Sequence, residues 1–179
     1  MTKTVFENCN LFVGTSDEMV DNAWFVVDNE TGKLVKSGSE QCTEQVDERV
    51  DLEGQYVMSG LLNAHTHVGS LSTKDPVYAT TETSVTYNAL KNLREGLRGG
   101  VTYIRSCGVP FDVDVKLKKI RKALPFEGPE IKPAGMPVSI LGGHADYMVG
   151  ENNDQPVSHL VNSPDEMRRA VREQFKKGA

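Results

Sequence analysis

The sequence predicts an α/β chain in which a small unit of β-strands precedes strands that alternate with helices. Up to residue 58, short apolar runs alternate with polar residues. A near-continuous apolar run then spans residues 56–68, and two helical patterns separate the strand-like runs that follow. The composition agrees with a globular protein, because 38% of the 179 residues are hydrophobic and 25% are charged.

Residues 3–58 have the pattern of β structure throughout. Residues 24–28 and 33–36 are expected to form a hairpin, because the intervening residues 29–32 (NETG) are turn formers that include a glycine. We therefore assign residues 1–58 to an N-terminal β domain.

Residues 59–179 are expected to alternate strands and helices as a second domain. The run at residues 56–68 (YVMSGLLNAHTHV) is typical of a strand buried on both faces, as in a parallel sheet. The further elements expected are a helix at 81–98, a strand at 101–107, a helix at 112–124, a strand at 132–140 and a helix at 163–177. Alternation at this spacing indicates βαβ units and a parallel sheet.

The last of these helices has the clearest start signals. Ser163 is expected to be the N-cap, Pro164 the first helical residue, and Glu166 the partner in a capping box. The residues expected to face the core are Met167, Ala170, Val171 and Phe175.

Charge, hydropathy and cysteine content exclude several classes of protein. The net charge is −5, and the one basic run, residues 116–122, fits a solvated helix face, so no nucleic-acid partner is expected. No apolar stretch approaches the roughly 20 residues of a membrane helix. Residues 1–10 lack the apolar core of a secretory signal, so we expect a cytoplasmic protein without a membrane partner. Cys9, Cys42 and Cys107 are too few for a disulfide framework.

Two of the four histidines, His65 and His67, lie two residues apart on the expected apolar strand. Residues i and i+2 of a strand point to the same face, so the two imidazoles are expected to converge. Convergent imidazoles bind Zn²⁺ or a similar divalent ion, although such a pair also occurs inside proteins without a metal. The position at the end of an apolar strand, before Gly69 and a Ser/Thr-rich loop, favours a metal site.

The residues around this pair resemble a known family. Residues 57–67 (VMSGLLNAHTH) resemble the first barrel strand of the metal-dependent amidohydrolase superfamily, which usually reads apolar-Met-Pro-Gly-Leu-Ile-Asp-x-His-x-His. Ser59 and Asn63 stand where the family has Pro and Asp, and neither difference affects the two histidines.

Three later segments extend the resemblance along the chain. Residues 99–105 (GGVTYIR) resemble the family's second strand. Residues 142–146 (GGHAD) resemble a loop of the branch that holds imidazolonepropionase-like proteins and prolidase-like dipeptidases, and residues 163–179 resemble its third helix.

The resemblance implies a (β/α)8 TIM barrel preceded by a small β-sandwich portion, with the first three βα units in residues 59–179. It implies that His65 and His67 bind a divalent metal ion, zinc, and that the complete enzyme holds one or two ions. A lysine, two further histidines and an aspartate from later strands would complete the site, so no catalytic residue is expected within this span. Because a complete barrel takes about 250 residues, we expect these 179 residues to be an N-terminal segment that is inactive alone.

The implied activity is hydrolysis of amide C–N bonds, in peptides or cyclic amides. The substrate would be a small molecule such as a dipeptide or an N-acyl amino acid, and deaminases share the His-x-His strand. His144, which follows two glycines, is expected to bind substrate, and the alternative is a loop histidine that bonds to the backbone. His159 is expected in a solvent-exposed loop.

A second class of function stays open for the chain. It would be a non-catalytic remnant or assembly module that keeps the start of the fold without its chemistry. In either case the open edge of the third strand predicts association with another copy of the chain, or with a complementing C-terminal segment.

Overall fold

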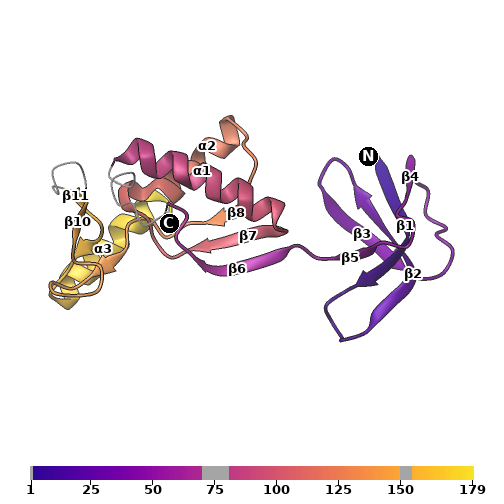
Figure 1. Cartoon of the computed structure of the whole chain (residues 1–179), viewed down its shortest axis with the longest axis horizontal. Coiled ribbons are helices and arrows are strands. Elements are labelled where there is room, and N and C mark those ends of the chain that lie inside the picture. The colour runs from indigo at the N-terminus through magenta and orange to yellow at the C-terminus, as the bar shows by residue number, and fades with distance from the viewer. Residues whose placement is uncertain (1, 70–80, 150–154) are drawn as a thin grey trace. The chain divides into compact units, whose positions relative to one another are not determined.

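The computed structural model describes residues 2–69, 81–149 and 155–179. The chain divides into two compact units, Met1–Ser59 and Gly60–Ala179. Figure 1 shows strands β1 to β5 in the first unit and all three labelled helices in the second. No helix within the described ranges is long and apolar enough to cross a membrane. The Ser/Thr-rich loop expected after Gly69 lies outside the described residues.

The first unit is a single mixed sheet. Its strands are β1 (Lys3–Phe12), β2 (Met19–Asp28), β3 (Lys33–Gly38), β4 (Glu48–Asp51) and β5 (Tyr56–Met58). β1 is central, because it pairs antiparallel with β2 and parallel with both β4 and β5. β2 and β3 are antiparallel, and Gly32 in their turn has a φ of 65°, which confirms the predicted hairpin.

The core of the first unit lies on one face of this sheet. It is formed by Val5, Trp24, Val26 and Cys42, with Val46 packed against them. The indole N–H of Trp24 donates to the Glu40 carbonyl, so the polar atom of this large side chain has a partner.

The hairpin turn after β2 depends on Asp28. Its Oδ1 accepts hydrogen bonds from the backbone N–H groups of Thr31, at 3.2 Å, and Glu30, at 2.9 Å. These bonds, that of Thr31 first, hold the pKa of the Asp28 carboxyl below its usual range. Because the pKa of this carboxyl is lower in the folded state than in the unfolded state, its ionised form stabilises the fold at pH values above the ordinary pKa of Asp. This contribution is lost as the pH falls through the lowered pKa.

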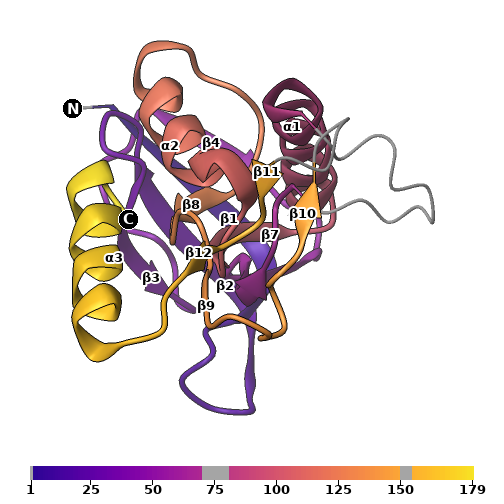
Figure 2. The same ribbon diagram turned by 90° about the vertical axis from the view of Figure 1, so that its left-hand side faces the viewer.

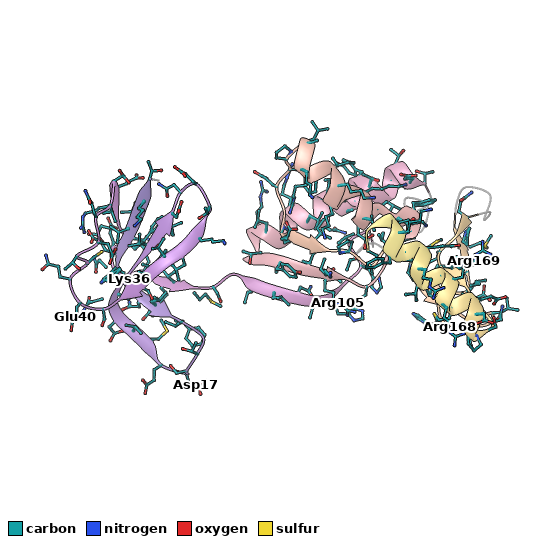
Figure 3. All side chains as sticks on the ribbon, turned by 180° about the vertical axis from the view of Figure 1, so that it is seen from behind. Asp17, Lys36, Glu40, Arg105, Arg168 and Arg169 are labelled. Atoms are coloured by element: carbon teal, nitrogen blue, oxygen red, sulfur yellow. The ribbon has the colours of Figure 1, made fainter. Side chains whose placement is uncertain are left out.

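We therefore expect Asp28→Asn to reduce the loss of stability that the first unit shows as the pH falls. The unfolding midpoint in denaturant, followed by circular dichroism from neutral to acidic pH, should fall less steeply in the variant than in the wild type. Asp17→Asn, in the exposed loop between β1 and β2 (Figure 3), is the matched control and should retain the wild-type slope. Equal slopes for Asp28→Asn and the wild type would refute this role of Asp28.

The second unit alternates strands and helices, as predicted. Its main elements are β6 (Leu61–Thr66), α1 (Glu82–Arg98), β7 (Val101–Ser106), the 3-10 helix η2 (Pro110–Asp112), α2 (Val113–Ala123), β8 (Glu130–Lys132) and α3 (Pro164–Lys177). Two-residue strands are β9 (Val138–Ser139), β10 (Met148–Val149), β11 (Gln155–Pro156) and β12 (His159–Leu160). β6, β7 and β8 form a parallel sheet in that order, which confirms the predicted parallel pairing.

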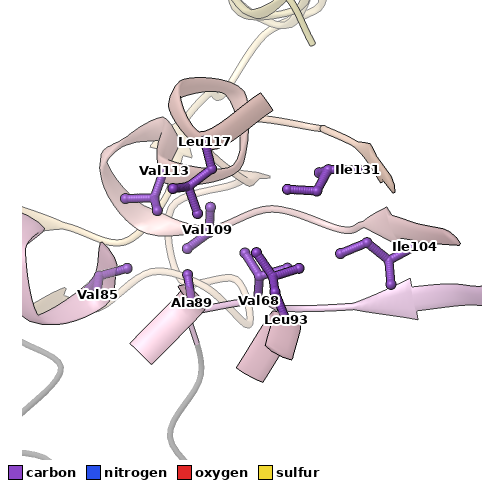
Figure 4. Packing of buried hydrophobic residues seen from close by; sticks show 9 residues of the cluster. All are labelled: Val68, Val85, Ala89, Leu93, Ile104, Val109, Val113, Leu117 and Ile131. Carbon is purple, nitrogen blue, oxygen red and sulfur yellow. The ribbon is translucent and has the colours of Figure 1, made fainter. Parts of the chain in front are cut away.

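Helices α1 and α2 pack on one face of this parallel sheet (Figures 1 and 4). The buried cluster between them is formed by Val68, Val85, Ala89, Leu93, Ile104, Val109, Val113, Leu117 and Ile131. Thr81 caps α1 by accepting the Ser84 N–H, and Gly99 ends the helix as predicted. The sheet and these two helices thus form the body that carries the strand ends.

The expectation that the first parallel strand is buried on both faces is wrong for this chain. β6 is an edge strand that pairs with β7, and most of its side chains are exposed, with Leu62 63% exposed. The apolar run at residues 56–68 also forms two strands and not one, because β5 pairs with β1 in the first unit whereas β6 pairs with β7 in the second. Burial of such strands depends on partners that local sequence does not specify.

The predicted strand at residues 132–140 is two separate short strands, β8 and β9. Pro133 and Pro137 have no N–H to donate to a ladder, and Gly135 has a φ of 76°. These residues turn the chain where the apolar pattern suggested continuous pairing. β9 pairs instead with β12, and Figure 2 shows the chain leaving β12 and turning into α3.

Helix α3 has the predicted N-cap but a different buried face. The Ser163 Oγ accepts the Glu166 N–H at 3.2 Å, whereas the Glu166 carboxylate accepts from Asn162 rather than from Ser163, so the capping box is incomplete. Ala170 is buried as expected, together with Gln174. Three predicted core residues are exposed, namely Met167, Val171 and Phe175. The helix therefore presents an apolar stripe to its surroundings.

Candidate metal centre

His65 and His67 lie where β6 ends. His65 is the second-last residue of β6, and His67 is the first residue after the strand. Both histidines are exposed. Their ring centroids are 5.4 Å apart, with the ring planes at 69°. Two imidazoles bound to one tetrahedral zinc ion have centroids roughly 5 Å apart, given a Zn–N distance of about 2.0–2.1 Å. The spacing of the two rings therefore fits a shared ion.

The tautomer of His67 is set by a backbone group. Its Nδ1 lies 2.8 Å from the carbonyl oxygen of Gly108, the second residue after β7. A carbonyl oxygen can only accept a hydrogen bond, so the ring hydrogen must be on Nδ1 and the lone pair on Nε2. Histidines that bind metals use this arrangement, in which the second ring nitrogen donates to a carbonyl or carboxylate. His67 thus fits a metal ion bound through Nε2.

The pairing of β6 with β7 is irregular next to the histidines. The register of β6 and β7 shifts between Asn63 and Thr66, and the Asn63 Oδ1 accepts the His65 N–H at 3.1 Å. Such irregularities change the direction in which side chains point. The approach of the two rings therefore depends on this local geometry as well as on their spacing of two residues.

Two cationic side chains lie at the carboxyl ends of the neighbouring strands. Arg105 of β7 is paired in register with Lys132 of β8, and both are exposed (Arg105 is labelled in Figure 3). The guanidinium of Arg105 lies 3.9 Å from Cys107 Sγ. Because the three strands are parallel, their carboxyl ends lie at one end of the sheet. The two cations and the two histidines are therefore at the same end.

His144 lies in an exposed turn after β9. The turn is closed by Asp146, whose Oδ2 accepts the Gly142 N–H at 2.6 Å, and by the Gly143 N–H, which donates to the Ile140 carbonyl at 2.8 Å. The carboxylate of Asp146 therefore fixes this turn, which is the role that the sequence left as the alternative for His144. The imidazole of His144 is left exposed to solvent.

The expectation for His159 is wrong. It belongs to β12 and is half-buried, and its Nδ1 lies 3.9 Å from Oε2 of Glu173 on α3. The hydrogen bond from Arg169 holds the pKa of the Glu173 carboxyl below its usual range. The imidazole of His159 thus joins a polar contact between β12 and α3.

The histidine pair is a partial ligand set. Among residues 2–69, 81–149 and 155–179, no three or more His, Cys, Asp or Glu side chains gather where they could hold a metal ion. Sequence reasoning singled out both histidines but missed the Gly108 carbonyl. The feature of the sequence that could have indicated this contact is Gly108 itself. It comes directly after the predicted strand at 101–107, at the same end of the sheet as the histidines.

Comparison with known proteins extends this picture beyond the site. No family model matches the chain. A 5-methylthioadenosine/S-adenosylhomocysteine deaminase of Bacillus cereus is 36% identical over 67 residues, which are 37% of this chain and 15% of the deaminase. The crystal structure of an amidohydrolase matches 99% of the chain with a TM-score of 0.82 and 26% identity. The chain is thus similar over its whole length to the N-terminal portion of amidohydrolases.

A second amidohydrolase-type structure shares the fold over the same length. A Xaa-Pro dipeptidase with methionine bound in its active site matches 99% of this chain, with a TM-score of 0.82 and 24% identity. The chain spans 45% of each of these two structures and fits their N-terminal portion. Superfamily relatives are metal-dependent, which agrees with the donor chemistry of the histidine pair.

Proposed function

We propose that the full-length protein is a metal-dependent hydrolase of amide C–N bonds, in which His65 and His67 bind a divalent ion. The observation that carries this proposal is the 2.8 Å contact between His67 Nδ1 and the Gly108 carbonyl, beside a second imidazole at 5.4 Å. Imidazole ligands favour zinc among the common divalent ions, so zinc is the proposed metal, as one ion or two.

The proposed architecture is the beginning of a TIM barrel preceded by a β-sandwich portion. Residues 1–58 would be the sandwich portion, and residues 59–179 would supply the first three βα units. The parallel order β6, β7, β8 and the helices on one face of that sheet support this assignment. In such barrels the reaction takes place at the carboxyl ends of the strands, where the two histidines lie.

The chain's own residues would hold the ion and orient the substrate. His65 and His67 would each donate a nitrogen lone pair, and the Gly108 carbonyl would keep the His67 hydrogen on Nδ1. A bound divalent ion supplies a Lewis acid and lowers the pKa of water. Because two neutral imidazoles carry no negative charge, we expect residues outside this chain to complete the ligand set and to move the proton.

The proposed substrate is a small molecule with a carboxylate beside the scissile amide, such as a dipeptide or an N-acyl amino acid. Arg105 and Lys132 support this class, because guanidinium and ammonium groups at the strand ends can pair with a carboxylate. The methionine bound in the similar Xaa-Pro dipeptidase is itself an amino acid with a free carboxylate. We assign His144, on its exposed turn, to substrate binding.

A second candidate is hydrolytic deamination of a purine-like ring by the same kind of metal site. The match to the Bacillus cereus deaminase favours it, at 36% identity over 67 residues. An assembly role without catalysis is the alternative outcome. The exposed apolar residues of β6 and α3 support association with another copy, or with a complementing C-terminal segment.

The test is to purify the full-length protein, measure its metal content and assay three substrate groups. These are Xaa-Pro dipeptides, N-acyl amino acids and adenosine derivatives. We expect stoichiometric zinc and hydrolysis of an amide substrate that carries a carboxylate, lost with a chelator and restored by zinc. Turnover restricted to adenosine derivatives would favour the deaminase, whereas a metal-free, inactive protein would favour the assembly role.

A further inference from the structure

The Gly108 carbonyl that holds His67 belongs to a segment that requires glycine. Gly108 has a φ of 112°, and a Cβ placed there would lie 2.5 Å from Cγ of Pro137. The Gly108 N–H donates to Oγ of the buried Ser106 at 3.3 Å. The position of the carbonyl therefore depends on how the chain around Pro137 is held.

Asp114 holds that part of the chain from inside the core. It lies in the first turn of α2 and its side chain has no exposed surface. Its Oδ2 accepts the N–H groups of Ala134, at 2.9 Å, and Gly135, at 3.2 Å, while Oδ1 accepts the Val115 N–H at 2.8 Å. Bonds from N–H groups to a carboxylate are stronger than those to a neutral acceptor, so Asp114 fixes the turn at Gly135.

Gly135 in turn holds the peptide group that contacts His67. The Gly135 carbonyl accepts the Val109 N–H at 3.0 Å. That N–H and the Gly108 carbonyl belong to the same peptide group, which is planar. A bond at one end of this group therefore fixes the direction of the carbonyl at the other end, and it also polarises that carbonyl as an acceptor.

We propose that Asp114 is a positioning residue for His67. By fixing Gly135, it orients the Gly108–Val109 peptide, whose carbonyl keeps the His67 hydrogen on Nδ1 and leaves Nε2 available to a metal ion. This role rests on the proposed function, since the tautomer of His67 affects chemistry only if His67 is a metal ligand. The path of hydrogen bonds itself is independent of the metal.

The structure offers a matched pair of variants. Asp114→Asn keeps the shape of the side chain but replaces one acceptor oxygen with an NH2 group, which would face N–H donors in either orientation. Asp112→Asn is the control. Its Oδ1 accepts the Met136 N–H at 2.8 Å and can still do so, while only the 2.8 Å ion pair of Oδ2 with Lys177 is lost. Asp112 has a φ of 53°, which asparagine tolerates well.

The experiment uses the full-length protein, with histidine ring nitrogens labelled and observed by NMR at a pH where imidazole is neutral. The metal-free wild type and Asp112→Asn should show His67 with its hydrogen on Nδ1. Asp114→Asn should show a mixture of tautomers in a folded protein. Zinc affinity, measured by competition with a chelator, should fall in Asp114→Asn by the factor set by the lost Nδ1–H population, about two- to tenfold for a mixture, and should keep the wild-type value in Asp112→Asn.

An unchanged His67 tautomer in folded Asp114→Asn would overturn the proposal. If that variant does not fold, the wild type provides the test in sub-denaturing guanidinium. At concentrations that expose the Gly135 amide to hydrogen exchange while α1 stays protected, His67 should lose its tautomer preference, and retention of the preference would overturn the proposal. If the tautomer shifts as expected but His67→Ala leaves the zinc content unchanged, the positioning role stands and the proposed function fails.

Discussion

The proposed function predicts that replacing His67 with Ala in the full-length protein removes most of the bound metal and nearly all of the hydrolytic activity. His67 supplies a nitrogen whose lone pair is fixed on Nε2 by the Gly108 contact. Loss of a direct ligand should reduce metal affinity by more than the roughly 10–100-fold that follows loss of an outer-shell partner. Elemental analysis and kcat/KM for the best amide substrate, measured on the same preparation, report the two effects together.

Two other histidines supply the controls for this variant. His159→Ala should keep wild-type zinc content and kcat, because the imidazole of His159 is directed to Glu173 on α3. His144→Ala should keep its zinc but show a higher KM with little change in kcat, as expected for a residue that binds substrate without holding metal. Full zinc occupancy in a His65→Ala, His67→Ala double variant would contradict the assignment of the metal centre.

Replacing Trp24 with Ala is expected to destabilise the first unit by about 3–5 kcal/mol, as large-to-small changes of buried aromatic residues do. Trp24 packs with Val5 and Val26 in a small core, and a Cβ placed at Gly38 would lie 2.8 Å from its ring. Few other side chains are available to fill the space. Chemical denaturation followed by far-ultraviolet circular dichroism would measure the change.

Trp24→Phe separates packing from hydrogen bonding at the same position. It keeps an aromatic ring but loses the indole N–H that donates to the Glu40 carbonyl. A loss of about 1 kcal/mol is expected for this bond, in addition to a smaller packing loss than in Trp24→Ala. A Trp24→Ala variant with wild-type stability would show that the first unit does not depend on this core.

The parts of the fold that could be predicted from the sequence are those specified by neighbouring residues. The hairpin at residues 29–32 is fixed by its own turn chemistry. The alternation of strands and helices follows from the periodicity of apolar residues, and the start of α3 follows from Ser163 and Pro164. Each of these signals lies within a few residues of the structure that it predicts.

The parts that could not be predicted depend on distant partners. The contact between His67 and Gly108 joins residues 41 positions apart. The hydrogen bonds that Asp114 accepts from Ala134 and Gly135 cross 20 or more positions. The exposure of Phe175, at 79%, likewise depends on what packs against α3 and not on its periodicity. The proximity of the two candidate ligands, His65 and His67, was therefore predictable from their spacing, but the groups that orient them were not.

The central position of β1 has a consequence for the order in which the first unit can form as the ribosome releases the chain. β1, β2 and β3 are consecutive, so their antiparallel pairs can form from neighbouring segments as soon as Gly38 has emerged. The other edge of β1 must wait for β4, which starts only at Glu48, and then for β5. Until then the nascent chain carries a strand with an open edge, which is the feature most prone to pair with a neighbouring nascent chain.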